Sequence, residues 1–480
     1  MGSLPNLETP PQISRISTVV PATPRGEENS AYNLNYMDLL MKLHYIRSIY
    51  LFNSKAVQNL SISDLKAPMF QLLDSYSHVS GRVRISESGR PFIKCNDAGV
   101  RIAESHCEKT LREWLDEKEY SVDELVYDHV LGPDLAFSPL VFVKFTFFKC
   151  GGLSVGLSWA HILGDAFSAR NFITKWSHTL AGQAPPKSLH MPNLTKPQFL
   201  SNSVYDNPIS IKRATTIEEY WLAATDSYVA THTFHITSKQ LHHLLTTSTS
   251  TNININTKTK YFEIISAMIW KCIGQIRGNF GPRVVTICTT NISNRAENEF
   301  PTNGSVLSKI ETSLSPGESE ISELVKLIAE KKMNENHGLE KMMEEGEGKD
   351  DFIVYGAKLT FVDLEEGNFY GVKINGQKPI LANCDFRGVG DQGVVLVLSG
   401  PEDYNGNNGR MVTISLPGKE LDQLKCKLSF SCKLQPWNFL RESEQRGDTT
   451  TATTITTTST TVSVTMATTN IATTTTFVLR

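Results

Sequence analysis

The chain has 480 residues, of which 40% are hydrophobic and 20% are charged, and its formal net charge at pH 7 is −3. This length and composition indicate a globular protein with room for two domains. The small net charge gives no reason to expect nucleic-acid binding or electrostatic attachment to anionic membranes.

The eight cysteines include no CxxC pair and no Cys/His cluster with zinc spacing. We therefore expect reduced thiols, mostly buried, and no metal site. The first residues, MGSLPNLETPPQ, have neither the basic region nor the apolar core of a signal peptide. The most apolar run, Ser138–Phe148, is interrupted by Lys144 and is much shorter than a membrane span. We expect no transmembrane segment, so that any membrane association is peripheral or through a partner.

The first hundred residues predict a mixture of strands and helices. Residues 17–20 are expected to form a strand, and residues 32–52 show helical spacing followed by an apolar, aromatic run. Residues 61–76 open with Ser and Asp, which are good helix caps, and continue with apolar residues at helical spacing, so they predict a helix. The alternating residues 81–105 predict two or three short strands.

The middle of the chain predicts a buried hairpin followed by a helix. Residues 139–160 consist of two strand-like runs joined at Cys150-Gly-Gly, and at least one strand is expected to be buried on both faces. A helical stretch then runs from Asp165 to about Thr179. Residues 261–278 are apolar nearly all round, which predicts a buried helix.

Composition divides the chain into four parts. The proline-rich segment 183–215 has no periodicity and predicts a linker between an N-terminal domain, 1–182, and a C-terminal domain, 216–430. Residues 431–480 are dominated by Thr with scattered small apolar residues, and this composition predicts a disordered tail.

The strongest chemical signal is the segment SWAHILGDAFSA, residues 158–169. A histidine at the end of a strand, here His161, can point into a cleft, and Gly164 allows the backbone to turn sharply. A neutral imidazole, with an ordinary pKa of about 6.5, can take a proton from an alcohol or an amine. Such a base would activate an acceptor to attack an acyl thioester directly, which is consistent with the lack of a GxSxG nucleophile elbow.

Two structural alternatives stay open for these residues. His161 can be a core histidine whose nitrogens are satisfied inside the protein. Asp165 can be the N-cap of the following helix or the ion-pair partner that holds the loop carrying His161, and both of these roles are structural.

The same segment resembles the HxxxD signature of the BAHD acyltransferases, the plant family that moves acyl groups from coenzyme A thioesters. The stretches LNYMDL, SYSHVSGRVR, PFIKCNDAGV and AMIWKC fall in the order typical of that family, and the resemblance covers about residues 17–425. It implies an α/β fold of two chloramphenicol-acetyltransferase-like domains, with mixed β-sheets flanked by helices and a tunnel between the domains. It also implies that His161 is the general base, that Gly164 and Asp165 are structural, and that acyl-CoA is a co-substrate with no tightly bound cofactor.

Four stretches are more similar to one branch of that family, the eceriferum branch of cuticular-wax proteins: MDLLMKLHYIRSIYLF, VYDHVLGPDLAFSPLVFVKF, FKCGGLSVGLSWAHILGD and GVGDQGVVLVL. Members of this branch are implicated in extending very-long-chain acyl groups. The resemblance implies a role in very-long-chain fatty acid elongation for wax, in which the chain transfers or holds acyl groups from acyl-CoA. The expected location is the cytosolic side of the endoplasmic reticulum, or the cytosol, and the expected state is a monomer.

Two other functions stay open. The first is a non-catalytic accessory or binding subunit of the fatty acid elongase condensing enzyme. The second is an ordinary acyl-CoA-dependent O- or N-acyltransferase of plant specialised metabolism. The intact HxxxD motif favours an enzyme that transfers groups other than amino-acyl groups, and we lean towards that interpretation.

The second signature of the family, DFGWG, is degenerate in this chain. We place it at residues 385–391, where Gly388 and Gly390 keep the two glycines, valine replaces tryptophan, and Asp385 is one residue out of register. In the family this motif is structural and its aspartate pairs with an arginine on another segment, for which Arg295 is the candidate here. The change in this motif favours the accessory function.

Overall fold

The structure is a computed structural model that describes nine segments of the chain: 12–24, 31–117, 122–127, 138–184, 208–214, 229–248, 261–290, 300–403 and 406–432. Most of the predicted linker 183–215, almost all of the predicted tail 431–480, and Arg295 lie outside the described residues. The division of the chain at residues 182 and 216 stays a prediction.

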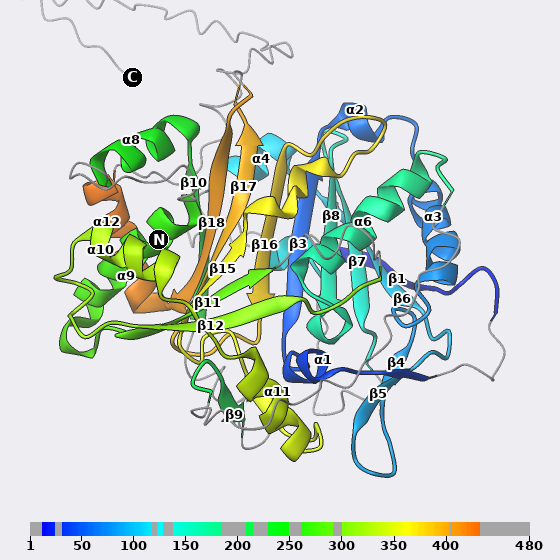
Figure 1. The fold of residues 1–480 in the computed structure, drawn as a ribbon. Helices are drawn as coiled ribbons and strands as arrows, with labels where there is room; N and C mark the ends of the chain where they lie inside the picture. The colour runs from blue at the N-terminus through cyan, green and yellow to red at the C-terminus, as the bar shows by residue number, and fades with distance from the viewer. Residues whose placement is uncertain are drawn as a thin grey trace, which may run out of the picture. The chain divides into compact units, whose positions relative to one another are not determined.

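The first of two large sheets is mixed and has six strands (Figure 1). Its order is β1 (Gln12–Val19), β6 (Val100–Cys107), β7 (Val141–Phe148), β8 (Leu153–Ala160), β3 (Tyr45–Phe52) and β16 (Leu381–Arg387). Only β6 and β7 are parallel among these neighbours. The strand β16 comes from late in the chain, so the C-terminal part contributes an edge strand to a sheet that is otherwise N-terminal.

The second sheet is also mixed and has seven strands. Its order is β10 (Val229–Ile236), β18 (Asn408–Pro417), β17 (Val394–Glu402), β15 (Leu359–Leu364), β11 (Val284–Thr290), β12 (Ser305–Glu311) and β13 (Met333–Asn334). The pairs β11–β15 and β15–β17 are parallel. Two small sheets complete the strands: β2 (Ala31–Asn33), β5 (Pro91–Lys94) and β4 (Arg82–Ile85), and β14 (Asp351–Ile353) with β9 (Lys212–Ala214).

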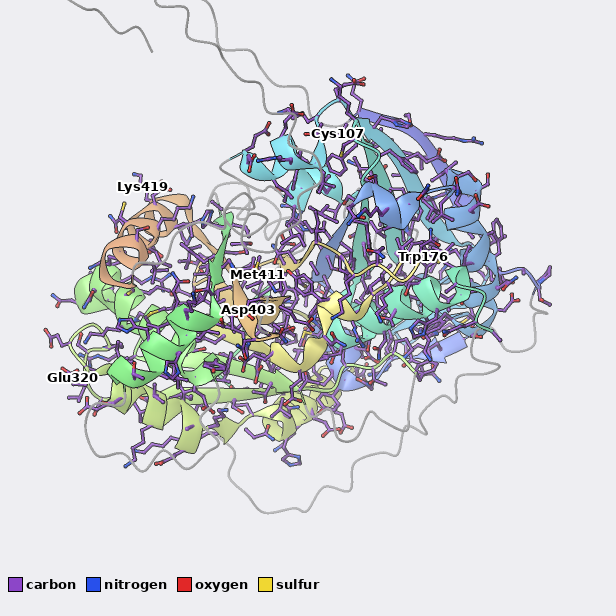
Figure 2. The ribbon with its side chains drawn as sticks, turned by 90° about the horizontal axis from the view of Figure 1, so that it is seen from above. Cys107, Trp176, Glu320, Asp403, Met411 and Lys419 are labelled. Atoms are coloured by element: carbon purple, nitrogen blue, oxygen red, sulfur yellow. The ribbon has the colours of Figure 1, made fainter. Side chains whose placement is uncertain are left out.

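Helices flank both large sheets, as the resemblance implies. On the side of the first sheet lie α1 (Tyr36–Leu40), α2 (Ser54–Val57), α3 (Ile62–Ser75), α4 (Leu111–Asp116), α5 (Val122–Leu125) and α6 (Ala166–Leu180). On the side of the second sheet lie α8 (Ser238–Ser248), α9 (Tyr261–Arg277), α10 (Ile321–Glu330), α11 (Asn336–Glu345) and α12 (Gly418–Cys432). Figure 2 shows Trp176 of α6 on the first side and Lys419 of α12 on the second.

Each face of the second sheet packs into a different apolar core. In β15, Phe361 belongs to the cluster formed with α9 and α10, whereas Val362 belongs to the larger cluster that also contains the first sheet. This alternation follows from the two-residue period of a strand. The larger core is therefore continuous from the first sheet to the inner face of the second sheet.

Local sequence signals located several of these elements correctly. The helix predicted at 61–76 is α3, and Ser61 caps it by accepting a hydrogen bond from the Asp64 amide in a capping box. The hairpin of β7 and β8 is confirmed, and β8 is buried along its whole length. The strand predicted at 17–20 is β1, which begins earlier, at Gln12.

Among the cysteines whose side chains the structure describes, most thiols are buried, as predicted. The free cysteines with buried side chains are Cys95, Cys107, Cys272, Cys288 and Cys384, whereas Cys150 and Cys426 are exposed. Every helix within the described ranges is too short or too polar to cross a membrane. In the same ranges, no three His, Cys, Asp or Glu side chains are grouped so that they could hold a metal ion.

Candidate functional site

His161 begins a short 3-10 helix, η2 (His161–Leu163), directly after the buried strand β8. Its backbone N–H donates to the carbonyl oxygen of His44 at 3.0 Å. Gly164 then turns the chain with a φ of 149°, and a Cβ at this position would lie 2.8 Å from the Cβ of Ser168. The turn therefore requires glycine, and it separates the histidine from the start of α6.

Both ring nitrogens of His161 are hydrogen-bonded to side chains of the chain itself. Nδ1 lies 3.0 Å from Oδ1 of Asn303, and Nε2 lies 2.9 Å from the hydroxyl oxygen of Tyr355. The Asn303 amide nitrogen donates to Oδ1 of Asp38 at 3.0 Å and to the His161 carbonyl at 2.9 Å, so its oxygen faces the ring. His161 must then donate from Nδ1, which leaves Nε2 to accept the hydrogen of Tyr355.

Burial keeps the charged forms of these groups unfavourable. It lowers the pKa of His161 below its ordinary value, although Asp165 acts in the opposite direction. It also raises the pKa of Tyr355 well above its ordinary value, with the nearby Cys288 adding to the shift. Burial raises the pKa of Asp38 to about 7. The ring is thus a neutral imidazole with one defined tautomer, which is the form that a general base requires.

Asp165 caps α6 and fixes the loop that carries Asn303. Its Oδ1 accepts a hydrogen bond from the Ser168 amide at 3.2 Å, and its Oδ2 accepts one from the Gly304 amide at 3.3 Å. Its own amide donates to the Thr302 carbonyl at 3.2 Å. Of the two structural roles considered for Asp165, the helix cap is therefore observed, and it also connects the HxxxD segment to the loop at 302–304.

A second buried histidine, His44, joins three segments around the site. Its carbonyl accepts from the His161 amide, and its Nε2 accepts from the Val354 amide at 3.0 Å, one residue before Tyr355. Its Nδ1 lies 3.4 Å from the carbonyl of Arg387 at the end of β16. Burial lowers the pKa of His44 to about 3. His44 is consequently neutral, and its hydrogen bonds connect the segments that carry His161, Val354 and Arg387.

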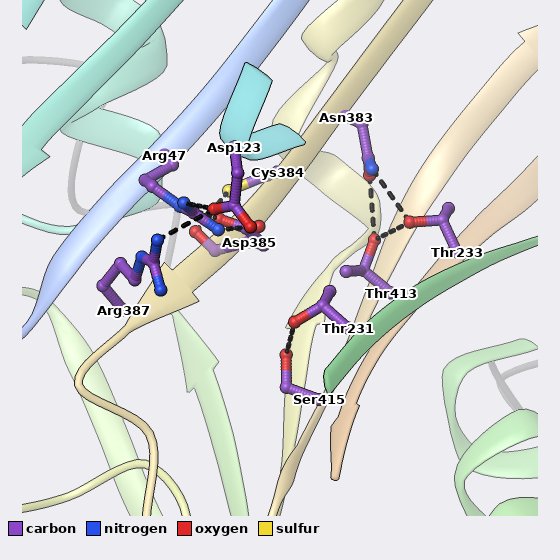
Figure 3. Close-up of polar contacts among 10 residues, drawn as sticks. All are labelled: Arg47, Asp123, Thr231, Thr233, Asn383, Cys384, Asp385, Arg387, Thr413 and Ser415. Carbon is purple, nitrogen blue, oxygen red and sulfur yellow. Dashed lines mark hydrogen bonds and ion pairs between the residues drawn. The ribbon is translucent and has the colours of Figure 1, made fainter. Parts of the chain in front are cut away.

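Asp385 lies on β16 and forms a bidentate ion pair with Arg47 on β3 (Figure 3). The two nitrogen–oxygen distances are 2.7 and 2.5 Å. Arg47 also pairs with Asp123 of α5, which in turn lies 2.9 Å from Arg387. Burial raises the pKa of Asp385, and the guanidinium of Arg47 opposes that shift. The proposed partner Arg295 lies outside the described residues; the partner that the structure contains is Arg47.

Gly388 and Gly390 lie in the turn between β16 and β17. Gly388 has a φ of 79°, and Gly390 approaches Gly356 so closely that a Cβ on Gly390 would lie 2.6 Å from the Gly356 carbonyl oxygen. The Gly390 amide donates to the Tyr355 carbonyl at 2.9 Å. This turn therefore holds the backbone on which Tyr355 is carried.

A buried polar cluster connects β16 to the second sheet (Figure 3). Asn383 of β16 donates to Thr233 of β10 at 2.9 Å and accepts from Thr413 of β18 at 2.8 Å. The two threonine hydroxyls lie 3.1 Å apart. Every partner in this cluster is satisfied, so it fixes the position of β16 between the two sheets.

Sequence reasoning identified His161, Gly164 and Asp165 but missed the residues that complete the site. Asn303 and Tyr355 come from distant parts of the chain, and no local pattern marks them. Asp38, His44 and Arg47 carry a signal, because they lie in the stretches LNYMDL and MDLLMKLHYIRSIYLF, on which the resemblance rests.

The comparisons with known proteins agree with this fold. The model of the Transferase family matches residues 12–430. Protein ECERIFERUM 2 of Arabidopsis thaliana is 40% identical over 425 residues, which cover 86% of this chain and 96% of that protein. Protein ECERIFERUM 26-like of Arabidopsis thaliana is 37% identical over 418 residues, which cover 86% of this chain and 94% of that protein.

Two solved structures show the same α/β fold, which confirms the predicted fold class. Vinorine synthase has a TM-score of 0.62 and 16% identity, with 87% of this chain and 97% of that one covered. TRI101 of F. graminearum, complexed with coenzyme A and T-2 mycotoxin, has a TM-score of 0.62 and 14% identity, with 82% and 97% covered.

Proposed function

The chain belongs to the Transferase family of BAHD acyltransferases, and from this premise we propose that it acts in very-long-chain fatty acid elongation for cuticular wax, where it holds or transfers acyl chains from acyl-CoA. The observation that carries the proposal is the 40% identity to Protein ECERIFERUM 2, which extends over 96% of that relative. We further propose that the chain works at the cytosolic side of the endoplasmic reticulum or in the cytosol, beside the elongase condensing enzyme.

If the chain transfers acyl groups, His161 is the base. Nδ1 is held as a donor by Asn303, so Nε2 can accept the proton of an acceptor hydroxyl or amine. The acceptor oxygen or nitrogen then forms a bond to the thioester carbonyl, the carbon–sulfur bond breaks, and the coenzyme A thiolate takes the proton from the imidazolium. Burial of the ring favours the neutral form that starts this sequence.

A second candidate is a non-catalytic accessory of the elongase condensing enzyme, and one observation favours it. Nε2 of His161 already accepts a hydrogen bond from Tyr355. In this arrangement the histidine satisfies the buried groups around it and leaves no acceptor site on the ring for a substrate.

The acyl chain lengths produced in a host that expresses an elongase distinguish the two candidates. We compare wild type, His161→Ala and His178→Ala at matched amounts of folded protein. His178 is an exposed histidine at the end of α6 and is the matched control. Transfer by His161 predicts loss of the longest products in His161→Ala alone, whereas identical products from all three proteins would exclude catalysis by His161. No change of products between wild type and a host without the chain would refute the elongation role itself.

A further inference from the structure

The hydroxyl of Tyr355 occupies the place that an acceptor would need. A general base removes a proton from a group whose heavy atom lies about 2.6–3.2 Å away. The Tyr355 oxygen lies 2.9 Å from Nε2 of His161, and both side chains are buried, with exposures of 1% and 0%. While the phenol of Tyr355 donates to the lone pair of Nε2, the hydroxyl of an acyl acceptor cannot donate to the same lone pair.

The backbone that carries Tyr355 is fixed from both sides. On one side, the amide of Val354 donates to Nε2 of His44 at 3.0 Å. On the other side, the carbonyl of Tyr355 accepts a hydrogen bond from the Gly390 amide at 2.9 Å. Gly356 has a φ of 83°, and a Cβ there would lie 2.5 Å from the Gly390 carbonyl oxygen. Both glycines are therefore required for this close approach of the two loops.

The ring of Tyr355 is packed as firmly as its backbone. Its centroid lies 4.5 Å from that of Phe386 on β16 and 5.0 Å from that of His44. The Cys288 thiol also interacts with the phenol. Moving the phenol away from His161 would break these contacts and would leave a buried hydroxyl to find another partner.

We propose that Tyr355 is an internal stopper of the His161 base, so that the chain holds an acyl group without transferring it to an external acceptor while Tyr355 stays in place. The inference rests on the proposed function, which supplies acyl-CoA as the ligand. Of the two actions proposed there, it favours holding the acyl chain over transferring it. Tyr355 is a positioning residue in this arrangement, because it acts through His161.

The first test measures coenzyme A release from stearoyl-CoA by the purified full chain in the presence of a primary alcohol. Tyr355→Ala removes both the hydroxyl and the ring, so water or the alcohol can reach Nε2. We expect release to be about 10²–10⁴ times faster than in wild type, which is the contribution typical of a general base. The double variant His161→Ala/Tyr355→Ala should lose this gain. Tyr355→Phe is the matched control, because its ring still fills the space.

Three results would overturn the proposal. Wild type could release coenzyme A as fast as Tyr355→Ala, or a folded Tyr355→Ala that binds stearoyl-CoA could be as slow as the double variant. An intact mass showing an acyl group on Tyr355 would make the phenol an acceptor and not a stopper.

A second test does not depend on the cavity that alanine leaves. In protein labelled with ¹⁵N at histidine, the Nε2 resonance of His161, assigned with His161→Ala, should shift in Tyr355→Phe because one hydrogen bond is lost. An unchanged resonance would show that Tyr355 does not donate to the ring. The two hypotheses thus fail in different experiments. Coenzyme A release and the ¹⁵N resonance of the purified chain test the role of Tyr355, whereas acyl chain lengths in the host test the elongation role.

Discussion

Asp385→Asn should destabilise the chain by about 3 kcal/mol, because it leaves the buried guanidinium of Arg47 without its main partner. Asp385 and Arg47 have side-chain exposures of 1% and 4%, and two hydrogen bonds join them. Removing one partner of a buried pair costs about 3–5 kcal/mol. Arg47 keeps its contact with Asp123, so the lower end of this range applies. The side chain of Asp123 is 55% exposed, and exposed pairs contribute only about 0–1 kcal/mol. Asp123 therefore offsets little of the stability that Arg47 loses with Asp385.

The neighbouring ion pair provides a matched control within the same cluster. Arg387 is 47% exposed where it meets Asp123, so Arg387→Gln should cost less than about 1 kcal/mol. Urea unfolding at pH 7, followed by tryptophan fluorescence, gives both changes in the free energy of unfolding. Equal and small losses in the two variants would refute the reasoning, because they would show that the buried pair gains no more from its charges than an exposed one.

Three further predictions follow from the same contacts. Asp165→Asn keeps the helix cap but puts an N–H group against the Gly304 amide, so we expect a loss of about 1–3 kcal/mol in thermal unfolding whichever function is correct; unchanged stability with abolished function would assign Asp165 a direct chemical role. Burial lowers the pKa of His44 from its ordinary 6.5 to about 3, so below pH 6.5 the unfolded chain takes up a proton that the folded chain refuses. Wild type should therefore lose about 2 kcal/mol of stability from this group by pH 5 relative to His44→Gln, and parallel pH profiles of the two proteins would contradict this assignment. The raised pKa of Asp38 changes stability in the opposite direction, because this group stabilises the folded chain as the pH falls. It does so in wild type and in His44→Gln alike, so the difference between the two proteins isolates the effect of His44. Removal of residues 447–480 should change the melting temperature by no more than about two degrees, because a Thr-rich segment buries too little apolar surface to offset an ordering cost of about 1–2 kcal/mol per residue; a fall of about ten degrees would show that it packs.

What the sequence predicted correctly depends on local physics. The caps of α3 and α6 are visible because Ser61 and Asp165 bond to amides three residues away. The hairpin of β7 and β8 is visible because its strands are adjacent in the chain and its turn contains two glycines. In both cases the stabilising contact lies within a few residues of the pattern that predicts it.

What the sequence could not predict depends on contacts across the chain. Arg47 and Asp385 are 338 residues apart, and His161 and Asn303 are 142 residues apart. The partner of Asp385 is decided by β16 pairing with β3, and an alternating strand pattern does not say which sheet a strand joins. The family resemblance supplied the predicted base, His161, and the motif around it, but not the residues that this chain places against the ring.

The two candidate functions require different things of His161. The described contacts meet every requirement of a structural histidine, and every requirement of a catalytic base except a lone pair that faces the substrate. A catalytic base needs a defined tautomer and a neutral ring, which Asn303 and burial supply. It also needs a lone pair that faces its substrate, whereas Nε2 faces Tyr355. A structural histidine needs both nitrogens satisfied, and here both are. The HxxxD segment can therefore be retained for packing alone, because removal of the ring would leave Asn303 and Tyr355 without their buried partner. Loss of folded protein in His161→Ala would then imitate loss of chemistry, and for this reason product lengths decide between the two functions only at equal amounts of folded chain.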